Sequence, residues 1–297
     1  MDVLTSVVIR TYNEQKHIDR LLKGIYDQQF PMDNLQVIIV DSGSTDDTLK
    51  IAGKYPVELV QIKPEDFTFG YSLNKGIEHA KGDYIIMISA HCYPMDENWI
   101  SNMIEPFAND EKAAVVYGKQ KGKDTTRYSE HCIFGTWFPE KAVAKQETPF
   151  CNNANCAIRR SLWEKHRYNE KLTGLEDLDW AKEIQKRGYY IYYQANAGIY
   201  HIHNETYPQI YNRYRREAIA IKNIYPDLKL GFFEFVRLLS SNIFNDVLSS
   251  ISDKSVIENF TSIIAFRFFQ FWGTYRGHQF NKEVAMELKK KFYYPSK

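Results

Sequence analysis

The sequence has almost no net charge and few cysteines, and each shortage excludes a class of protein. Among 297 residues, Lys and Arg total 38 while Asp and Glu total 37, so the formal net charge is +1. Proteins that bind nucleic acid usually carry a broad positive field, so we expect no nucleic-acid partner. The four cysteines are too few and too irregularly spaced for a disulfide scaffold in a chain of this length.

Long apolar runs are also missing. No stretch approaches the ~20 apolar residues that span a bilayer, and the longest candidate, residues 260–272, is interrupted by Arg267 and Gln270. The first residues show no basic segment followed by an apolar one, so we expect no secretory signal. The sequence therefore predicts a cytoplasmic protein that is soluble or bound peripherally to the inner face of the cytoplasmic membrane.

Two common nucleotide-binding motifs are absent. No G-x-G-x-x-G follows the first predicted strand, and G-x-x-x-x-G-K-[ST] does not occur. These glycine-rich turns bring the backbone close to the phosphates of a dinucleotide or of a nucleoside triphosphate. Their absence disfavours Rossmann-type dinucleotide binding and P-loop chemistry.

The first hundred residues alternate short β-branched runs with helical patterns, which is typical of parallel strands joined by crossover helices. The predicted strands are Val3–Ile9, Gln36–Asp41, Val57–Ile62 and Tyr84–Ser89, with helices at Glu14–Gln28, Thr45–Lys54 and Gly70–Ala80. The rhythm becomes irregular after residue 120, with strands expected near Tyr189–Tyr193 and Gly198–Ile202. It is helical towards the C-terminus, where the longer helices are expected at Leu230–Ser250 and Ile257–Tyr275. We therefore expect an α/β catalytic domain over residues 1–225 and a helical region over residues 226–297.

Polar segments follow the predicted strands, where an open α/β sheet places its ligand site. The first strand ends in Arg10-Thr11-Tyr12-Asn13-Glu14, the second in Asp41-Ser42-Gly43-Ser44, and the fourth in Ser89-Ala90-His91. A short carboxylate such as Asp41 can bond a nucleobase or ribose, while Gly43 lets the backbone turn beneath it. By itself, however, the run from Asp41 is equally typical of a capped helix start.

Four segments together resemble the inverting family 2 glycosyltransferases, which have the GT-A fold. They are Thr11-Tyr12-Asn13-Glu14, Val40-Asp41-Ser42-Gly43-Ser44-Thr45-Asp46, Asn74-Lys75-Gly76 before Gly82-Asp83, and Glu176-Asp177, in the family's order. The resemblance spans about residues 3–205. It implies a Rossmann-like, mostly parallel central sheet flanked by helices, a nucleotide-sugar donor, and a saccharide or polyprenyl-linked acceptor.

The resemblance also implies where the donor binds. A UDP-sugar is favoured, and GDP, CDP and dTDP sugars stay open. The residues that it places against the nucleotide sugar are Thr11, Tyr12, Glu14, Asp41, Ser42, Asn74, Ser89 and His91.

One departure concerns the metal. The family usually ends its fourth strand with Asp-x-Asp, whose carboxylate holds Mg²⁺ or Mn²⁺, but this chain has Ser89-Ala90-His91. Mg²⁺ prefers carboxylate oxygen, whereas imidazole suits Mn²⁺ and later metals better. We therefore expect a divalent metal, Mn²⁺ or Mg²⁺, held by His91 together with His201 or His203. The alternative is that His91 bonds the donor diphosphate directly and no metal is needed.

The second chemical site is the acidic run around Asp177. Inverting transfer needs a base for the acceptor hydroxyl, and the resemblance assigns that role to Asp177, with Glu176 orienting the acceptor. Ordinary capping would also place carboxylates at this helix start. Between the two sites, Asn152, Asn153 and Asn155 suit recognition of acceptor or sugar hydroxyls, although an Asx-rich turn explains them equally well.

Aromatic residues are abundant, at 15% of the chain, and many lie in residues 226–297 beside cationic side chains. Such helices are typical of a membrane surface or of a contact between protomers, as in a homodimer. The sequence predicts an inverting glycosyltransferase that helps to build a bacterial capsule, O-antigen or similar surface polysaccharide. The alternative is a non-catalytic nucleotide-sugar-binding or scaffold subunit.

Overall fold

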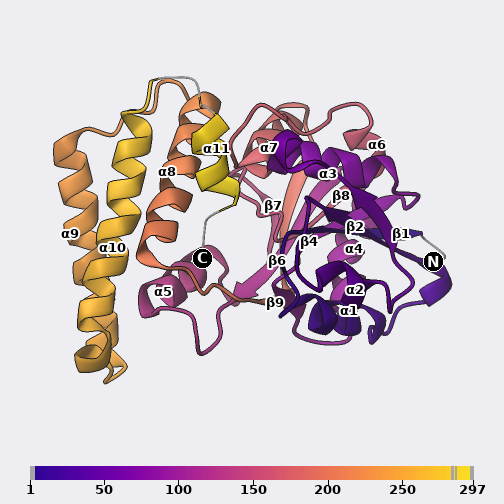
Figure 1. Ribbon diagram of the computed structural model, residues 1–297, viewed down its shortest axis with the longest axis horizontal. Coiled ribbons are helices and arrows are strands. Elements are labelled where there is room, and N and C mark those ends of the chain that lie inside the picture. The colour runs from indigo at the N-terminus through magenta and orange to yellow at the C-terminus, as the bar shows by residue number, and fades with distance from the viewer. Residues whose placement is uncertain (1–3, 282–283, 285, 295–297) are drawn as a thin grey trace. The chain divides into compact units, whose positions relative to one another are not determined.

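The computed structural model describes residues 4–281, 284 and 286–294, and the chain divides into two compact units (Figure 1). The first unit is formed by the chain up to Lys123 together with Phe138–Lys171 and Glu176–Ile202. The second unit is formed by Asp124–Trp137, Leu172–Leu175 and the chain from His203 onward. The boundary that the sequence predicts near residue 225 therefore falls inside the second unit.

The first half of the sheet is parallel, as the alternating pattern predicts. It contains β1 (Thr5–Thr11), β2 (Leu35–Asp41), β3 (Glu58–Gln61) and β4 (Tyr84–Ser89), in the order β3-β2-β1-β4. The cores of β1, β2 and β4 are almost completely buried, which suits β-branched residues on a sheet covered on both faces. The register pairs Thr11 with Asp41 and Arg10 with Ser89, so three strands end at one level.

Short helices connect these strands. They are α1 (Ile18–Tyr26), α2 (Thr48–Ala52) and α3 (Phe69–Glu78), with 3-10 turns η1 (Met32–Asn34) and η2 (Pro64–Asp66). The buried residues of α1 follow the helical spacing of its apolar residues. Helix α3 packs closely on the sheet because Gly76 has no side chain; a Cβ there would lie 2.5 Å from Val8 Cγ1.

The second half of the sheet is mixed. It contains β5 (Cys92–Pro94), β6 (Ala113–Lys121), β7 (Val143–Gln146), β8 (Asn155–Arg159) and β9 (Tyr190–His201). Strand β8 runs antiparallel to both β4 and β6, whereas β6 and β9 are parallel. The sequence predicts two strands near 189–193 and 198–202, but they are one long strand with a register shift against β6. The helices here are α4 (Trp99–Asn109), α6 (Arg160–Trp163) and α7 (Glu176–Lys186).

The second unit is helical. It contains α5 (Tyr128–Trp137), α8 (Tyr207–Ile224), α9 (Phe232–Ser252), α10 (Val256–His278) and α11 (Met286–Tyr293). Helix α10 lies beside both α8 and α9 (Figure 1). A buried ion pair ties α9 to α10, since Arg267 donates two hydrogen bonds of 2.7 Å to Asp246. The two long helices that the sequence predicts in this region are α9 and α10.

Candidate functional site

The loop after β2 folds around the carboxylate of Asp41. Its Oδ2 accepts hydrogen bonds from the backbone N–H groups of Gly43 at 2.9 Å and Ser44 at 3.0 Å. Gly43 has a φ of +93°, which glycine adopts without strain. Because Asp41 is fully buried in this turn, its immediate effect is to shape the loop. Its contact with a nucleobase stays a prediction.

Hydrogen bonds join the loop after β1 to the loop after β2. Asn13, with a left-handed φ of +54°, receives the Thr45 N–H on its Oδ1 at 2.8 Å. The N–H of Glu14 donates to Thr48 Oγ1 at 2.7 Å, and the N–H of Ser42 donates to the Thr11 carbonyl at 3.2 Å. Predicted nucleotide-binding residues therefore occupy two connected loops at the carboxyl ends of β1 and β2.

Two of the predicted metal-binding histidines lie together in the first unit. The rings of His91 and His201 stack with their centroids 5.1 Å apart, and one ring nitrogen of each lies within 4.8 Å of the other. His91 Nδ1 bonds Glu14 Oε1 at 2.8 Å, while His201 Nδ1 bonds Gln120 Oε1 at 2.7 Å. Ser89 lies just before this group and donates its N–H to a backbone carbonyl at 3.4 Å.

The third predicted metal ligand, His203, belongs to the second unit. There its Nδ1 bonds Glu130 Oε1 at 2.7 Å, and Arg213 Nη2 donates to the same oxygen at 2.7 Å. Arg213 also pairs with Glu205 at 2.7 Å. A guanidinium therefore already supplies positive charge to this carboxylate group, and a role of His203 as a metal ligand stays a prediction.

The acidic pair begins helix α7. Glu176 Oε1 accepts a hydrogen bond from Asn153 Nδ2 at 3.2 Å and pairs with Arg10 Nη1 at 3.4 Å. Asp177 accepts hydrogen bonds from the N–H groups of Asn153 at 2.9 Å and Leu178 at 2.8 Å. Arg10 lies at the end of β1, next to Thr11. Both chemical sites that the sequence predicts therefore lie at the same edge of the sheet.

Asp177 is in an environment that favours its protonated form. Burial, and then the negative charge of Glu176, raise the pKa of Asp177 from 3.8 to about 7, against the hydrogen bonds from Asn153 and Leu178 and the charge of Arg10. The residue before the pair, Leu175, has a φ of +57°. A branched side chain rarely adopts this conformation, and backbone strain of this kind is frequent at functional sites.

The asparagines of residues 152–155 divide between the site and the core. Asn153 holds both carboxylates of the acidic pair, as described above. Asn152 Oδ1 accepts the Ala154 N–H at 2.9 Å, which is the Asx turn of the alternative interpretation. Asn155 is fully buried: its amide bonds Trp99 and two backbone carbonyls. Asn155 therefore has a structural role here, and its contact with sugar or acceptor stays a prediction.

Asn74 is likewise a structural residue rather than a nucleotide ligand. Its Nδ2 donates to the Tyr168 carbonyl and to Glu170, and its Oδ1 accepts from Trp163 Nε1 and the Tyr168 N–H. Only 1% of the residue is exposed. All of its hydrogen-bonding groups thus bind α3 to the segment after α6, and its predicted contact with the donor is not supported.

The sequence interpretation missed Arg10 and His17. Arg10 follows three apolar residues of a buried strand and lies over the Phe69 ring at 4.7 Å. A buried charge needs a counter-charge, which was the available signal. The ring of His17 lies 6.4 Å from that of His91, and its Nδ1 contacts the Tyr93 hydroxyl. A histidine just before a helix carries no comparable signal in one sequence.

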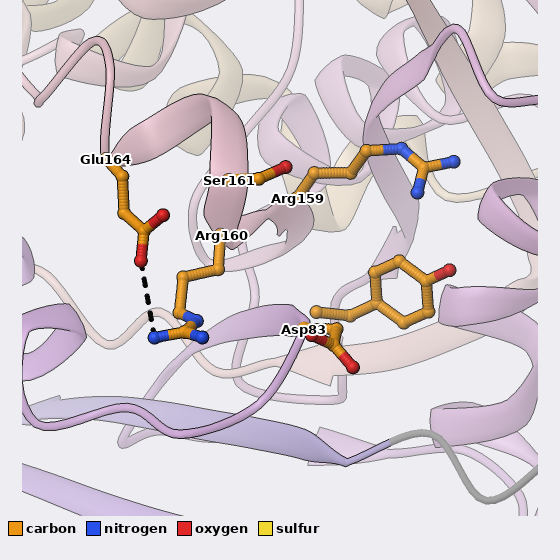
Figure 2. Close-up of a pocket in the computed structure, with 6 residues that line it drawn as sticks. Asp83, Arg159, Arg160, Ser161 and Glu164 are labelled. Atoms are coloured by element: carbon orange, nitrogen blue, oxygen red, sulfur yellow. Dashed lines mark ion pairs between the residues drawn. The ribbon is translucent and has the colours of Figure 1, made fainter.

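A separate polar pocket lies at the other end of β4 and β8 (Figure 2). It has a volume of about 290 Å³ and is lined by Asp83, Tyr84, Arg159, Arg160, Ser161 and Glu164. Arg159 and Arg160, two neighbouring arginines that follow the asparagine-rich segment in the sequence, line this pocket. Arg159 donates to the carbonyls of Phe107, Asp110 and Ala113. Arg160 pairs with Glu164 at 3.3 Å, so both arginines already have partners.

The comparison with protein families decides the classification. The model of glycosyl transferase family 2 matches residues 6–167, which is more than half of the chain. This chain belongs to glycosyl transferase family 2. The resemblance carried by the four sequence motifs is thereby confirmed.

Two curated relatives are bacterial glycosyltransferases. The chain is 30% identical over 190 residues to the O-antigen chain rhamnosyltransferase WbaN of Salmonella anatum, covering 60% of each chain. It is 24% identical over 264 residues to the poly(ribitol-phosphate) β-N-acetylglucosaminyltransferase TarS of Staphylococcus aureus, covering 86% of this chain and 43% of TarS. The match thus spans about three fifths of one curated relative and less than half of the other.

Solved structures confirm the GT-A fold. The mannosyltransferase PcManGT from Pyrobaculum calidifontis, in complex with GDP-Man and Mn²⁺, superposes with a TM-score of 0.61 at 17% identity, covering 99% of this chain and 88% of PcManGT. TarS residues 1–349, in complex with UDP-GlcNAc, superpose with a TM-score of 0.54 at 18% identity, covering 95% of this chain and 94% of that one. Among the residues described for our chain, no helix is both long and apolar enough to cross a bilayer.

Proposed function

We propose that this chain is an inverting glycosyltransferase that moves a sugar from a nucleotide sugar to a hydroxyl of a saccharide or lipid-linked saccharide acceptor. Family membership and the glycosyltransferase activities of WbaN and TarS support a role in bacterial surface polysaccharide synthesis. The reaction is a single displacement at the anomeric carbon of the donor sugar. A bond forms from the acceptor oxygen, the bond to the diphosphate breaks, and the acceptor proton passes to a base.

The observation that carries the proposal is the Asp177 carboxylate with its pKa raised to about 7. A base works best when its pKa is close to the working pH, because it is then both ionised and able to hold a proton. Asn153 and Leu178 fix the carboxylate through backbone N–H groups. Glu176, held by Arg10 and Asn153, lies next to it and orients the acceptor in our proposal.

The donor nucleotide is proposed to lie over the two connected loops. Thr11 and Tyr12 lie at the end of β1 and in the loop after it, and Asp41 and Ser42 at the end of β2 and in its loop. The carboxylate of Glu14, in the same loop as Tyr12, bonds His91. The hydrogen bonds between the loops preorganise this surface, which reduces the entropy lost on binding. Because Asp41 is buried, we propose that it acts through the backbone of its turn. Relatives bind GDP-Man and UDP-GlcNAc, so the nucleotide is left to experiment.

A divalent metal is part of the proposal, because the available ligands fit one. His91 and His201 each direct Nδ1 at a side-chain oxygen, an arrangement that proteins use for imidazoles that bind metal through Nε2. Imidazole ligands favour Mn²⁺ over Mg²⁺. When bound, such a cation neutralises charge that develops on the leaving diphosphate. His91 bonding the diphosphate directly stays the metal-free alternative.

The experiment is a donor screen on the full chain. We expect one of the UDP, GDP, CDP or dTDP sugars to be consumed, and its nucleoside diphosphate to raise the melting temperature. Both measurements are made with Mn²⁺ and with excess EDTA. Thermal stabilisation by a nucleoside diphosphate without consumption of any donor, in the presence of oligosaccharide and polyprenyl-linked acceptors, would instead favour the non-catalytic binding subunit.

The helical unit is proposed to mediate a contact with the membrane surface or with a second copy of the chain. The large apolar side chains exposed on α9 and α10 are Phe232, Phe233, Val236, Phe244, Leu248, Ile251, Ile257, Phe260, Ile264 and Phe268. Exposed apolar side chains that gather on neighbouring helices often mark interaction sites, so these residues support a docking role.

A further inference from the structure

The carboxylate of Glu14 forms a hydrogen bond with the imidazole of His91. Its Oε1 lies 2.8 Å from His91 Nδ1, and the two side chains are only 20% and 31% exposed. The backbone of Glu14 is fixed on both sides: its N–H donates to Thr48 Oγ1, and its carbonyl accepts from the N–H groups of His17 and Ile18 at 2.9 Å. The carboxylate is therefore held in place before any ligand arrives.

The neighbouring histidine repeats this arrangement. His201 Nδ1 lies 2.7 Å from Oε1 of Gln120, a residue that is 2% exposed. An oxygen that accepts the Nδ1–H of an imidazole fixes both the ring orientation and the tautomer, with the lone pair at Nε2. The two rings stack at 5.1 Å with an interplanar angle of 27°. Two oriented imidazoles thus stand side by side where relatives in the family have an acidic motif.

We infer that Glu14 is a positioning residue for His91, and that this carboxylate–imidazole pair replaces the Asp-x-Asp of the family in a site that selects Mn²⁺ over Mg²⁺. The inference rests on the proposed function, since the cation accompanies the donor diphosphate. It differs from the role that the family resemblance implies for Glu14, which is a direct contact with base or ribose. The two roles make opposite predictions for nucleotide binding without metal.

The test measures Mn²⁺ coordination on the full chain by pulsed electron paramagnetic resonance, with UDP and GDP as probes. We expect ¹⁴N coupling to the bound Mn²⁺ in the wild type and its loss in His91→Asn. Glu14→Ala should weaken Mn²⁺ binding about 10- to 100-fold, as removal of an oxygen partner of a ligating histidine commonly does. Glu14→Gln keeps an oxygen acceptor for Nδ1–H, so it should restore binding to within about threefold of the wild type.

Two controls separate positioning from folding and from nucleotide recognition. The exposed Glu111 lies before β6, so Glu111→Ala should leave Mn²⁺ binding unchanged. In EDTA, Glu14→Ala should bind UDP or GDP as the wild type does. Loss of that metal-free binding with intact Mn²⁺ coordination would overturn the inference, because Glu14 would then contact the nucleotide itself.

A wild-type Mn²⁺ spectrum without ¹⁴N coupling also overturns the inference. Donor consumption by the wild type in EDTA distinguishes this failure from failure of the proposed function. If transfer continues without bound Mn²⁺, the proposed glycosyltransferase activity stands and the metal-binding role of the Glu14–His91 pair is rejected. If Mn²⁺ binding depends on His91 but no donor supports transfer, the metal-binding role stands and the proposed activity is rejected.

Discussion

Two buried carboxylates, one in each unit, have opposite protonation behaviour. In the sheet unit, Asp177 has another carboxylate beside it and its pKa is raised to about 7. In the helical unit, burial alone would raise the pKa of Glu130, but the charges and hydrogen bonds of His203 and Arg213 outweigh burial and lower it to about 2. Both residues are similarly inaccessible, at 9% and 4% exposure, so burial does not explain the difference.

The groups that contact the two carboxylates explain the difference between their pKa values. Asp177 accepts hydrogen bonds from two backbone N–H groups, which stabilise a carboxylate without neutralising it, and Glu176 opposes its ionisation. Glu130 instead receives a guanidinium and an imidazole. A group that must exchange a proton cannot be locked in one state, whereas a group that holds helices together can. The contrast supports the proposed role of Asp177 as the base and indicates a structural role for Glu130.

The largest expected effect comes from Asp177→Asn. The Asn153 N–H bonds Oδ2 and the Leu178 N–H bonds Oδ1, so the amide keeps an oxygen for one of them and cannot accept the acceptor proton. Sugar transfer should therefore fall by about two orders of magnitude or more. The fold should persist at pH 8, because removal of a buried charge beside Glu176 offsets the loss of one hydrogen bond. Transfer is measured by release of nucleoside diphosphate.

Asp179→Asn is the matched control for that variant. Asp179 lies in the same turn of α7 and accepts a long hydrogen bond of 3.4 Å from Asn169 Nδ2. We expect its transfer rate to stay within about threefold of the wild type. Equal losses in both variants would mean that the start of α7 matters for structure and that Asp177 is not the base.

The second prediction concerns stability in the helical unit. Glu130→Gln leaves the guanidinium of Arg213 with Glu205 as its remaining carboxylate partner, so the free energy of unfolding should fall by about 2–3 kcal/mol. Denaturant titration measures the loss. Glu164→Gln breaks the half-exposed pair with Arg160 and should cost less than about 0.5 kcal/mol. A similar cost for both variants would contradict the structural role of Glu130.

The two pKa shifts have opposite directions, so acidification affects the two carboxylates in different pH ranges. The pKa of Glu130 is depressed, so its contribution to stability is present above about pH 4.5 and is lost as the pH falls towards 2. The pKa of Asp177 is raised, so transfer should decline about tenfold per unit as the pH falls below about 7, where the base becomes protonated.

Glu176→Gln sharpens this third prediction. Removal of the neighbouring negative charge should lower the pKa of Asp177 and shift the acidic limb of the kcat/KM profile to lower pH by about one unit. Arg10 acts in the same direction once it no longer pairs with Glu176. An acidic limb that does not move in Glu176→Gln, with transfer still measurable, would show that another group controls the limb.

Local patterns predicted the parallel strands, the connecting helices and the strand-end loops, because periodicity and turn residues depend on neighbours in the chain. The mixed half of the sheet depends on pairing between distant segments, so the antiparallel position of β8 was not visible. The two predicted strands of residues 189–202 are one strand for the same reason: β6 supplies the partner along its whole length, across a bulge.

The site shows the same limit. The acidic pair and the two loops were predicted by motif order, and the structure brings them to one sheet edge. Asn74 and Asn155 carry the residue type of a sugar-binding side chain, yet their amides bond Trp163 and Trp99 from distant parts of the chain. A single sequence does not reveal such long-range satisfaction of polar groups. Helix α5 joins the helical unit through contacts with α9 and α10 in the same way.

The smallest effect on catalysis is expected from substitutions on the exposed face of the helical hairpin, which is formed by α9 and α10. These substitutions test whether its apolar residues mediate a contact. Phe244 and Leu248 lie one turn apart on α9 and are 63% and 48% exposed. Replacing both by glutamate removes apolar area without opening a cavity, so stability should change by less than about 1 kcal/mol. Asn245→Glu adds a charge to the same exposed turn and serves as the control.

Two measurements on these variants separate the two proposed partners. If the face lies on a membrane, the double variant loses co-sedimentation with anionic vesicles at low salt, while the molar mass in light scattering is unchanged. If the face joins two copies, the molar mass halves in the double variant, and vesicles bind neither protein. Transfer to a short soluble acceptor should stay within about twofold in either case, because the partners described for the acidic pair, Arg10, Asn153 and Leu178, belong to the first unit. A double variant that behaves like the Asn245→Glu control in both measurements would remove the docking role and leave these apolar residues as solvent-exposed surface, of the kind that soluble proteins tolerate.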